Sequence, residues 1–328
     1  MKVLTVTIPS YNAEKYLNRG IPTLLDESIS ADIEIIIVDD GSTDHTARIA
    51  DEYHSKYPDT VKVLHKENGG HGSAINSGIQ EASGKYFCVI DADDWVDTAN
   101  FIKLVNLMKK CNSDLILANA MKVDSDDRKL GYEKITKLPN RREVPMDNYI
   151  GSISNIEMHN YFIRSDILKK NHIRCHEHCF YVDQEYVLYS LFHIKTVMFV
   201  DMIVYHYLIG RKGQSVSIES RRKQYDQYIA VTDFLLNFYL DNYIRMTVNQ
   251  RKLYERKIAW FISGTYAVLL SYHNREMKRK MQKYDREIKE KSLSIYKANR
   301  NLCIYLLRFS RFACYGLMAQ IYKMVRMK

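Results

Sequence analysis

The sequence predicts an α/β fold in which helices flank a mostly parallel central sheet, followed by a helical C-terminal appendage. In the first half of the chain, short β-branched runs alternate with segments of helical periodicity, which is the pattern of βαβ units. Beyond residue 218 only helical periodicity remains. The change of pattern predicts a first domain at residues 1–217 and a helical region at residues 218–328.

The individual elements follow from these patterns. We expect strands at residues 2–8, 33–38, 61–64, 86–90, 114–118, 160–164, 196–200 and 203–207. We expect helices at residues 14–25 and 99–110, and others that end near residues 57, 82 and 193. We expect residues 119–151 to leave the sheet and to contribute little to the core. Because parallel strands end at one edge of the sheet, the first four loops should converge there.

The charge of the chain is concentrated at its C-terminus. The net charge is +9, yet residues 271–328 hold 15 Lys and Arg against 4 Asp and Glu, leaving −2 for the rest. This tail predicts contact with an anionic surface, and no recognition motif supports nucleic acid as that surface. Six scattered cysteines and the lack of a signal peptide predict reduced thiols and a cytoplasmic location.

Residues 302–325 are apolar but interrupted by Arg308, Arg311 and Lys323. The longest uncharged run is too short to span a bilayer, so the sequence predicts a helix lying on the inner face of a membrane. Packing of this helix on the body of the protein or on a second subunit is the alternative.

Three carboxylates, Asp91, Asp93 and Asp94, follow the predicted strand at residues 86–90. Like charges crowded together repel each other unless a cation or protons intervene. Hard oxygen ligands at this place indicate Mg²⁺ or Mn²⁺ holding a phosphorylated ligand. A polar turn that closes the strand is the alternative.

Four segments read together resemble the inverting glycosyltransferases of family 2, which have the GT-A fold. The segments are IPSYNAEKYL, VDDGSTD, NGGHGSAINSG and VIDADDW, and the resemblance covers residues 1–217. It implies that Asp91 and Asp93, on either side of Ala92, form the Asp-x-Asp motif that binds the metal and the donor. It also implies that Asp39 and Asp40 meet the base and ribose of the nucleotide, although helix capping would explain both.

Further donor contacts are implied by the same resemblance. Pro9, Tyr11 and Glu14 would surround a uracil-type base, with Tyr11 stacking on it. Asn68 and Gly70 would let the backbone approach the ligand closely. The segment GRKGQSVS, with Arg211, Lys212 and Ser215, would close over the diphosphate unless it is a solvated loop.

Asp183 matches the carboxylate that acts as general base at the start of the acceptor-side helix. A structural carboxylate favoured by the helix dipole is the alternative, and Glu185 is the fallback base. His206 would complete the metal shell, although a lone histidine in a strand is usually there for packing. The five-residue spacing of CHEHC, residues 175–179, argues against a closed zinc site and favours an acceptor-side loop.

The expected function is the metal-dependent, inverting transfer of one sugar from a nucleotide diphosphate donor, UDP-linked, to a hydroxyl of a glycan or lipid-linked glycan. A sugar-nucleotide nucleotidyltransferase is one alternative. A catalytically reduced subunit that stabilises a partner in an oligomer is another. The sequence lacks Gln-x-x-Arg-Trp, which argues against a membrane-embedded processive synthase.

Overall fold

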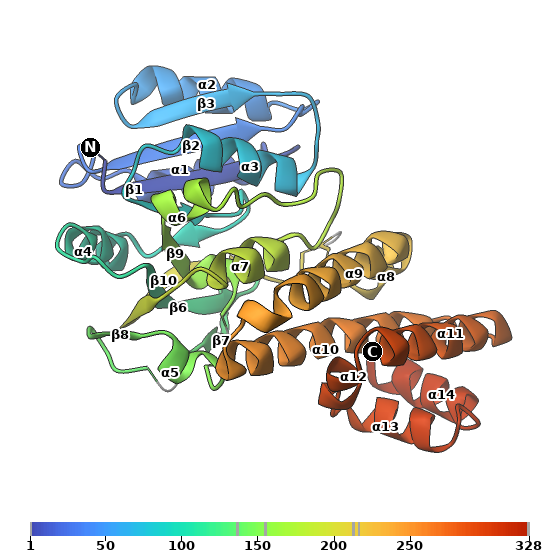
Figure 1. The fold of residues 1–328 in the computed structure, drawn as a ribbon. Coiled ribbons are helices and arrows are strands. Elements are labelled where there is room, and N and C mark those ends of the chain that lie inside the picture. The colour runs from blue at the N-terminus through green and yellow to red at the C-terminus, as the bar shows by residue number, and fades with distance from the viewer. Residues whose placement is uncertain (1, 136–137, 154–155, 212–213, 216, 327–328) are drawn as a thin grey trace. The chain divides into compact units, whose positions relative to one another are not determined.

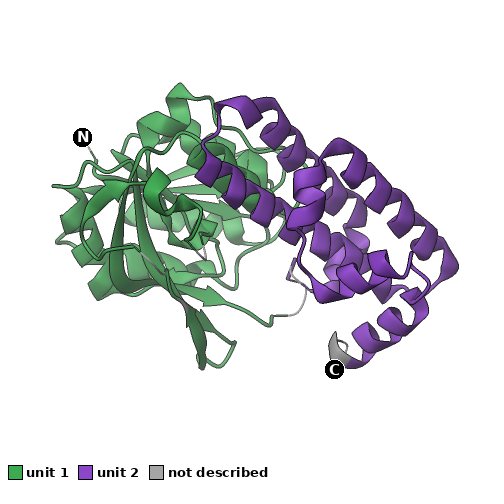
Figure 2. Cartoon of the chain, turned by 60° about the horizontal axis from the view of Figure 1, so that its bottom comes forward, with its two compact units in different colours: residues 1–212 green, residues 213–328 purple. Residues whose placement is uncertain are grey.

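The computed structural model describes residues 2–135, 138–153, 156–211, 214–215 and 217–326, and its elements are labelled in Figure 1. The chain forms two compact units, residues 1–212 and residues 213–328 (Figure 2). The first unit is an α/β domain and the second is helical, so the predicted fold class is confirmed.

The first unit is built on one mixed, mostly parallel sheet with the strand order β3-β2-β1-β4-β9-β6-β10-β5. Two further strands, β7 and β8, pair with β6 and β10. The strands are β1 (Leu4–Ser10), β2 (Ile33–Asp39), β3 (Val61–His65), β4 (Tyr86–Val89), β5 (Trp95–Val96), β6 (Leu115–Val123), β7 (Lys129–Glu133), β8 (Glu143–Pro145), β9 (Tyr161–Arg164) and β10 (Thr196–Leu208). Strands β1 to β4 run parallel, whereas β9 is antiparallel to both β4 and β6.

Helices cover the sheet on both faces (Figure 1). They are α1 (Leu17–Leu24), α2 (Thr46–Lys56), α3 (His71–Glu81), α4 (Thr98–Met108), α5 (Asp147–Ile150), α6 (Ser165–Lys170), α7 (Asp183–Leu191) and the short 3-10 helix η1 (Met158–Asn160). Every residue of β1, β2 and β4 is buried. Apolar runs buried on both faces are what a covered parallel sheet requires.

Three expectations about the elements differ from the structure. Residues 196–207 lie in one strand, β10, because irregular register around residues 200–205 carries the strand past Asp201 and Met202. Residues 119–151 do contribute to the core, since Ile135, Val144 and Ile150 are buried. The first helix also begins later than expected, at Leu17, after a turn in which Asn12 has a φ of 49°.

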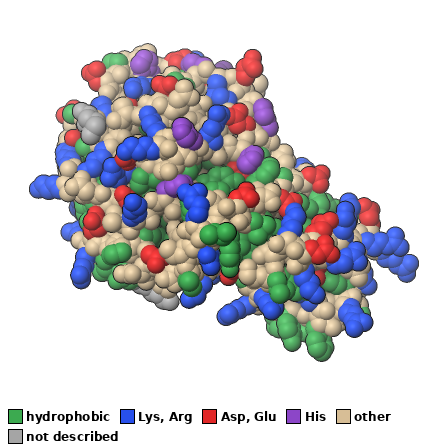
Figure 3. Space-filling view, viewed as in Figure 1, with side chains coloured by type: hydrophobic (Ala, Val, Ile, Leu, Met, Phe, Trp, Pro, Cys, Tyr) green, Lys and Arg blue, Asp and Glu red, His purple; other side chains and the backbone are tan. Residues whose placement is uncertain are grey.

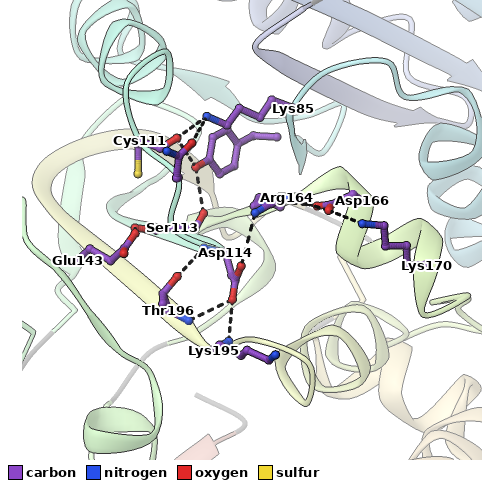
Figure 4. Close-up of polar contacts among 12 residues, drawn as sticks. Lys85, Cys111, Ser113, Asp114, Glu143, Arg164, Asp166, Lys170, Lys195 and Thr196 are labelled. Atoms are coloured by element: carbon purple, nitrogen blue, oxygen red, sulfur yellow. Dashed lines mark hydrogen bonds and ion pairs between the residues drawn. The ribbon is translucent and has the colours of Figure 1, made fainter.

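A polar network fastens the beginnings of β6 and β10 (Figure 4). The carboxylate of Asp114 accepts hydrogen bonds from the backbone N–H groups of Lys195 (2.9 Å) and Thr196 (3.1 Å). The Asp114 N–H in turn donates to the hydroxyl of Thr196 at 3.0 Å. These residues lie at the amino ends of parallel strands, so the network stabilises the edge of the sheet opposite the strands' carboxyl ends.

Replacing Asp114 with Ala is expected to lower the free energy of unfolding by about 2 kcal/mol, because two backbone N–H groups lose a charged acceptor. Chemical denaturation would measure the loss. Asp59→Ala, at an exposed position, is the control and should change the free energy of unfolding by less than about 0.5 kcal/mol. Equal values for the two variants would show that the Asp114 network contributes nothing.

The second unit consists of helices arranged around α10. They are α8 (Ile218–Lys223), α9 (Tyr225–Asn242), α10 (Val248–Ser271), α11 (Arg275–Lys291), α12 (Leu293–Ala298), α13 (Leu302–Phe309), α14 (Tyr315–Arg326) and the 3-10 helix η2 (Tyr243–Arg245). Arg308 joins them by donating to Asp285 at 2.7 Å and lying 3.6 Å from the Tyr296 ring centroid. Within the described ranges, no helix is long and apolar enough to cross a membrane.

Candidate active site

The loop after β4 brings Asp91 and Asp93 to the carboxyl ends of the parallel strands. Each carboxylate meets a basic side chain from a distant segment. Nε2 of His71, the first residue of α3, lies 3.0 Å from Oδ1 of Asp91. Nε of Arg211, which follows β10, donates to Oδ2 of Asp93. Arg211 therefore lies beside the aspartate loop, and its contact with a diphosphate stays a prediction.

The two carboxylates differ in their electrostatics. Burial raises the pKa of Asp91, but the hydrogen bond and charge of His71 outweigh it, so the pKa lies below its ordinary value. Burial and the charge of Asp91 raise the pKa of Asp93, despite its bond to Arg211. Asp91 and Asp93 are thus close enough for the charge of one to raise the pKa of the other, and their role in holding a cation stays a prediction.

Asp94 has a structural role beside this pair. Its carboxylate is buried and accepts hydrogen bonds from the hydroxyl of Tyr205 (2.6 Å) and the N–H of Leu208 (2.7 Å). The Tyr205 hydroxyl also accepts from the N–H of Asp91 at 3.2 Å. Asp94 and Tyr205 thus fix the aspartate loop to β10.

Asp39 is the last residue of β2 and Asp40 follows it, and both are almost completely buried. Asp39 accepts from the Ser42 N–H at 3.1 Å, and its other oxygen lies 3.0 Å from Nδ1 of His65. Asp40 accepts from the N–H groups of Gly69 (3.0 Å) and Gly70 (2.7 Å). Both carboxylates therefore shape the loops around them, and their contacts with a nucleotide stay a prediction.

The loop before α3 is shaped by a glycine. Gly70 has a φ of 83°, and a Cβ there would lie 3.3 Å from the backbone of His178. Only glycine suits both the conformation and the space. The side chain of Asn68 donates to the Asp40 carbonyl at 2.9 Å, which holds the same loop in place.

Three residues at the end of β1 and in the loop after it are predicted to surround a base. Pro9 lies buried within β1, whereas Tyr11 is 54% exposed and accessible for stacking. Glu14 accepts a hydrogen bond from the His45 N–H at 3.0 Å, so it satisfies the start of α2. Asp44 accepts hydrogen bonds from the N–H groups of Thr46 (2.9 Å) and Glu14 (3.2 Å), so it links the first loop to the start of α2.

Asp183 opens α7 and belongs to the same electrostatic cluster as the aspartate loop. Burial raises the pKa of its carboxylate, the hydrogen bond from Gln184 at 3.2 Å opposes this, and the charges of Glu157 and Asp91 raise it further. The charge of Asp183 in turn helps to raise the pKa of His71. The structure thus brings Asp183 together with Asp91 and His71. Its role as a base stays a prediction.

Glu185, the fallback base, is fully buried. Its Oε2 accepts from the His176 N–H at 2.9 Å and lies 3.0 Å from Nδ1 of the same histidine. Glu185 therefore holds the segment at residues 175–179 against α7. This engagement favours Asp183 over Glu185 as the base.

The prediction of His206 as a metal ligand requires correction. Tyr205 and Tyr207 on β10 face the aspartate loop, since the charges of Asp91 and Asp94 raise the pKa of both beyond the effect of burial. Because side chains alternate along a strand, His206 lies on the opposite face of the sheet. Its ring stacks on Trp95, with centroids 5.5 Å apart, and burial lowers its pKa.

The remaining residues of the predicted donor site are Ala92, Ser215 and Lys212. Ala92 lies half-buried between the two aspartates, and Ser215 belongs to the second unit, so its diphosphate contact stays a prediction. Lys212 falls outside the described residues.

Sequence reasoning missed the side chains of His71 and Tyr205. The sequence places His71 within the segment NGGHGSAINSG and Tyr205 within the expected strand at residues 203–207, and it predicts no role for either side chain. A basic residue at the start of a helix, in a loop predicted to share an edge with acidic residues, was the available signal for His71. For Tyr205 there was none, because the pairing of β10 with β6 is not visible in the sequence.

The donor set fits a divalent cation that binds together with a phosphorylated ligand. No group of three His, Cys, Asp or Glu side chains among the described residues could hold a metal ion alone. Asp91 and Asp93 supply two hard oxygen donors, and Mg²⁺-type ions commonly take one or two carboxylates and complete their shell with water and substrate phosphates.

Comparison with known proteins decides the family. The model of "Glycosyl transferase family 2" matches residues 5–188, more than half of the chain. The chain belongs to glycosyl transferase family 2. The match includes all the strand-end loops described above apart from Arg211, and it confirms the resemblance drawn from the four motifs.

Two proteins of Bacillus subtilis strain 168 are similar in sequence to this chain. The uncharacterized glycosyltransferase EpsJ is 36% identical over 126 residues, 38% of this chain and 36% of EpsJ. The putative glycosyltransferase EpsH is 26% identical over 267 residues, 79% of this chain and 74% of EpsH. The match to EpsJ therefore spans little more than a third of that protein's length.

Solved structures share the fold. Staphylococcus aureus TarS residues 1–349 in complex with UDP-GlcNAc superposes with a TM-score of 0.64 at 19% identity, covering 99% of this chain and 92% of TarS. The mannosyltransferase PcManGT from Pyrobaculum calidifontis, in complex with GDP-Man and Mn²⁺, has a TM-score of 0.51 at 13% identity, covering 99% of this chain and 88% of that one.

Proposed function

We propose that this protein transfers one sugar from a UDP-linked donor to a hydroxyl of a glycan or lipid-linked glycan, with inversion at the anomeric carbon. One observation carries the proposal: Asp91, Asp93, Arg211 and Asp183 converge from three segments at one edge of a family 2 sheet. Binding of UDP-GlcNAc by TarS, a protein of the same fold, supports a UDP-linked donor.

The donor half of the proposed site consists of Asp91, Asp93 and Arg211. Asp91 and Asp93 would hold Mn²⁺ or Mg²⁺ together with the donor diphosphate, as the Mn²⁺ in PcManGT supports. When bound, the metal supplies Lewis-acid stabilisation of the leaving diphosphate. Arg211 exchanges its bond to Asp93 for phosphate oxygens, which suit the planar donors of a guanidinium.

The acceptor half is Asp183. As the acceptor oxygen attacks the anomeric carbon, its proton passes to the Asp183 carboxylate, and the bond from the sugar to the diphosphate breaks on the opposite side. The raised pKa makes this carboxylate a stronger base than an ordinary aspartate. Gln184 holds it by a 3.2 Å hydrogen bond and also donates to Glu157 at 2.6 Å, which fixes the amide between two carboxylates.

Measurement of UDP release from a panel of UDP-sugars with Mn²⁺, without and with glycan acceptors, tests the proposal. We expect release from one UDP-sugar well above the rate with the others, and faster release when an acceptor is present. Pyrophosphate formation from UTP and a sugar phosphate would instead indicate a nucleotidyltransferase. Binding of UDP-sugars without any turnover would indicate a subunit that has lost catalysis.

A further inference from the structure

Helix α13 carries an apolar stripe on its outer face. Leu302, Tyr305, Leu306 and Phe309 are exposed by 71%, 59%, 36% and 78%. Their spacing of three, one and three residues places them along one face of the helix. Ile304 and Leu307 lie buried on the inner face, so α13 is already packed on its unit and still presents a second apolar face.

Helix α14 extends this surface. Leu317, Ile321 and Met324 are exposed by 56%, 40% and 63%, whereas Tyr315 and Ala319 face inward. The two helices contact each other. Figure 3 shows hydrophobic side chains gathered at the lower edge of the helical unit, where Figure 1 places α13 and α14. We call these seven exposed residues of α13 and α14 the apolar stripe.

The surroundings of the apolar stripe are cationic. Residues 291–328 contain eight Lys and Arg and no Asp or Glu. Arg300 precedes α13, Arg311 lies between α13 and α14, and Lys323 lies in α14, all three exposed. Basic side chains beside exposed aromatic and aliphatic ones suit the headgroup layer of an anionic bilayer, where rings and alkyl chains enter the interface and cations meet phosphate.

We propose that α13 and α14 form a monotopic docking surface for an anionic lipid bilayer. The chain lies on the membrane, since none of its described helices could span one. A second copy of the chain fits less well, because a symmetric contact through the stripe would bring together two copies of the cationic segment 291–328, which has no Asp or Glu. The proposal goes beyond glycosyl transfer and does not depend on it.

Co-sedimentation of the full chain with vesicles tests the proposal without any substrate. Vesicles of phosphatidylcholine with about one-third phosphatidylglycerol are compared with pure phosphatidylcholine. We expect the wild type to bind the anionic vesicles at least about tenfold more tightly than the neutral ones, with weaker binding at high salt. Equal binding to both, or no binding to either, would overturn the proposal.

Variants assign the binding to the stripe. The triple variant Leu302→Ser, Tyr305→Ser, Phe309→Ser should lose at least about tenfold in vesicle affinity, because three apolar side chains that would enter the lipid interface have been removed. Ile244→Ser, Val248→Ser, Trp260→Ser is the matched control, since these positions in the same unit are exposed by 91%, 65% and 57%. It should bind as the wild type does. Equal losses in both triples would overturn the assignment.

Two further readouts separate the alternatives. Thermal unfolding of both triple variants should match the wild type, since every replaced side chain is exposed. Sedimentation velocity without lipid should show the same oligomeric state for the wild type and the stripe variant. A wild-type dimer that the stripe variant dissociates would overturn the proposal in favour of a second copy of the chain.

Discussion

Asp183→Asn should lower kcat for sugar transfer by about 10²–10⁴-fold, because the amide cannot accept the proton of the acceptor hydroxyl. The donor should still bind, since Asp183 lies on the acceptor side of the proposed site. The fold should be kept or stabilised: burial raises the pKa of Asp183, so the charged form is disfavoured in the folded state above its unfolded pKa, and removing that charge relieves the penalty.

The same raised pKa predicts the pH dependence of transfer. The base must be deprotonated, so kcat should rise with pH through an apparent pKa above the ordinary aspartate value of 3.8. Asp226→Asn is the matched control, because Asp226 also lies in the first turn of a helix, α9. If both variants lost activity equally, or if Asp183→Asn kept full turnover, Asp183 would not be the base.

Asp93→Asn should lower Mn²⁺-dependent turnover by about 10²-fold or more, because the diphosphate loses stabilisation of its developing charge. It should also weaken UDP binding in the presence of Mn²⁺. The reason is that Asp93 joins the cation site to Arg211, the phosphate-facing cation. Kinetics at varied Mn²⁺ concentration would measure the first effect, and titration calorimetry with UDP the second.

Asp126→Asn provides the surface control for this change, since Asp126 forms an exposed ion pair with Arg128 at 3.4 Å. Exposed pairs contribute little, so its kinetics should equal those of the wild type. Turnover by Asp93→Asn that still depends on Mn²⁺ with the wild-type affinity would place the metal elsewhere.

The sheet was predictable because its strands have clear sequence patterns. Residues 33–38 and 86–90 are apolar and β-branched or aromatic, and each ends in aspartates, so both the strands and the edge that they share followed. The continuity of β10 was not predictable, since Asp201 and Met202 interrupt its pattern while pairing with β6 carries it onward. Which strand lies beside which depends on tertiary packing.

The contacts of the side chains around the aspartates were likewise not predictable from the sequence. Period-2 alternation puts Tyr205 and His206 on opposite faces, but which face meets the aspartate loop depends on the pairing of β10 with its neighbours. The loop-shaping bonds of Asp40 join β2 to the loop before α3, 29 and 30 residues away. Motifs identified these residues, and only the structure shows what they contact.

The central claim is that Asp91 and Asp93 serve the donor while Asp183 serves the acceptor. UDP binding with Mn²⁺ and sugar transfer, measured on the same preparations of Asp93→Asn and Asp183→Asn, test it most directly. The account predicts that Asp93→Asn is impaired in both UDP binding and transfer, whereas Asp183→Asn binds UDP as the wild type does and is impaired only in transfer. Loss of UDP binding in a folded Asp183→Asn, or normal binding and transfer in Asp93→Asn, would contradict it.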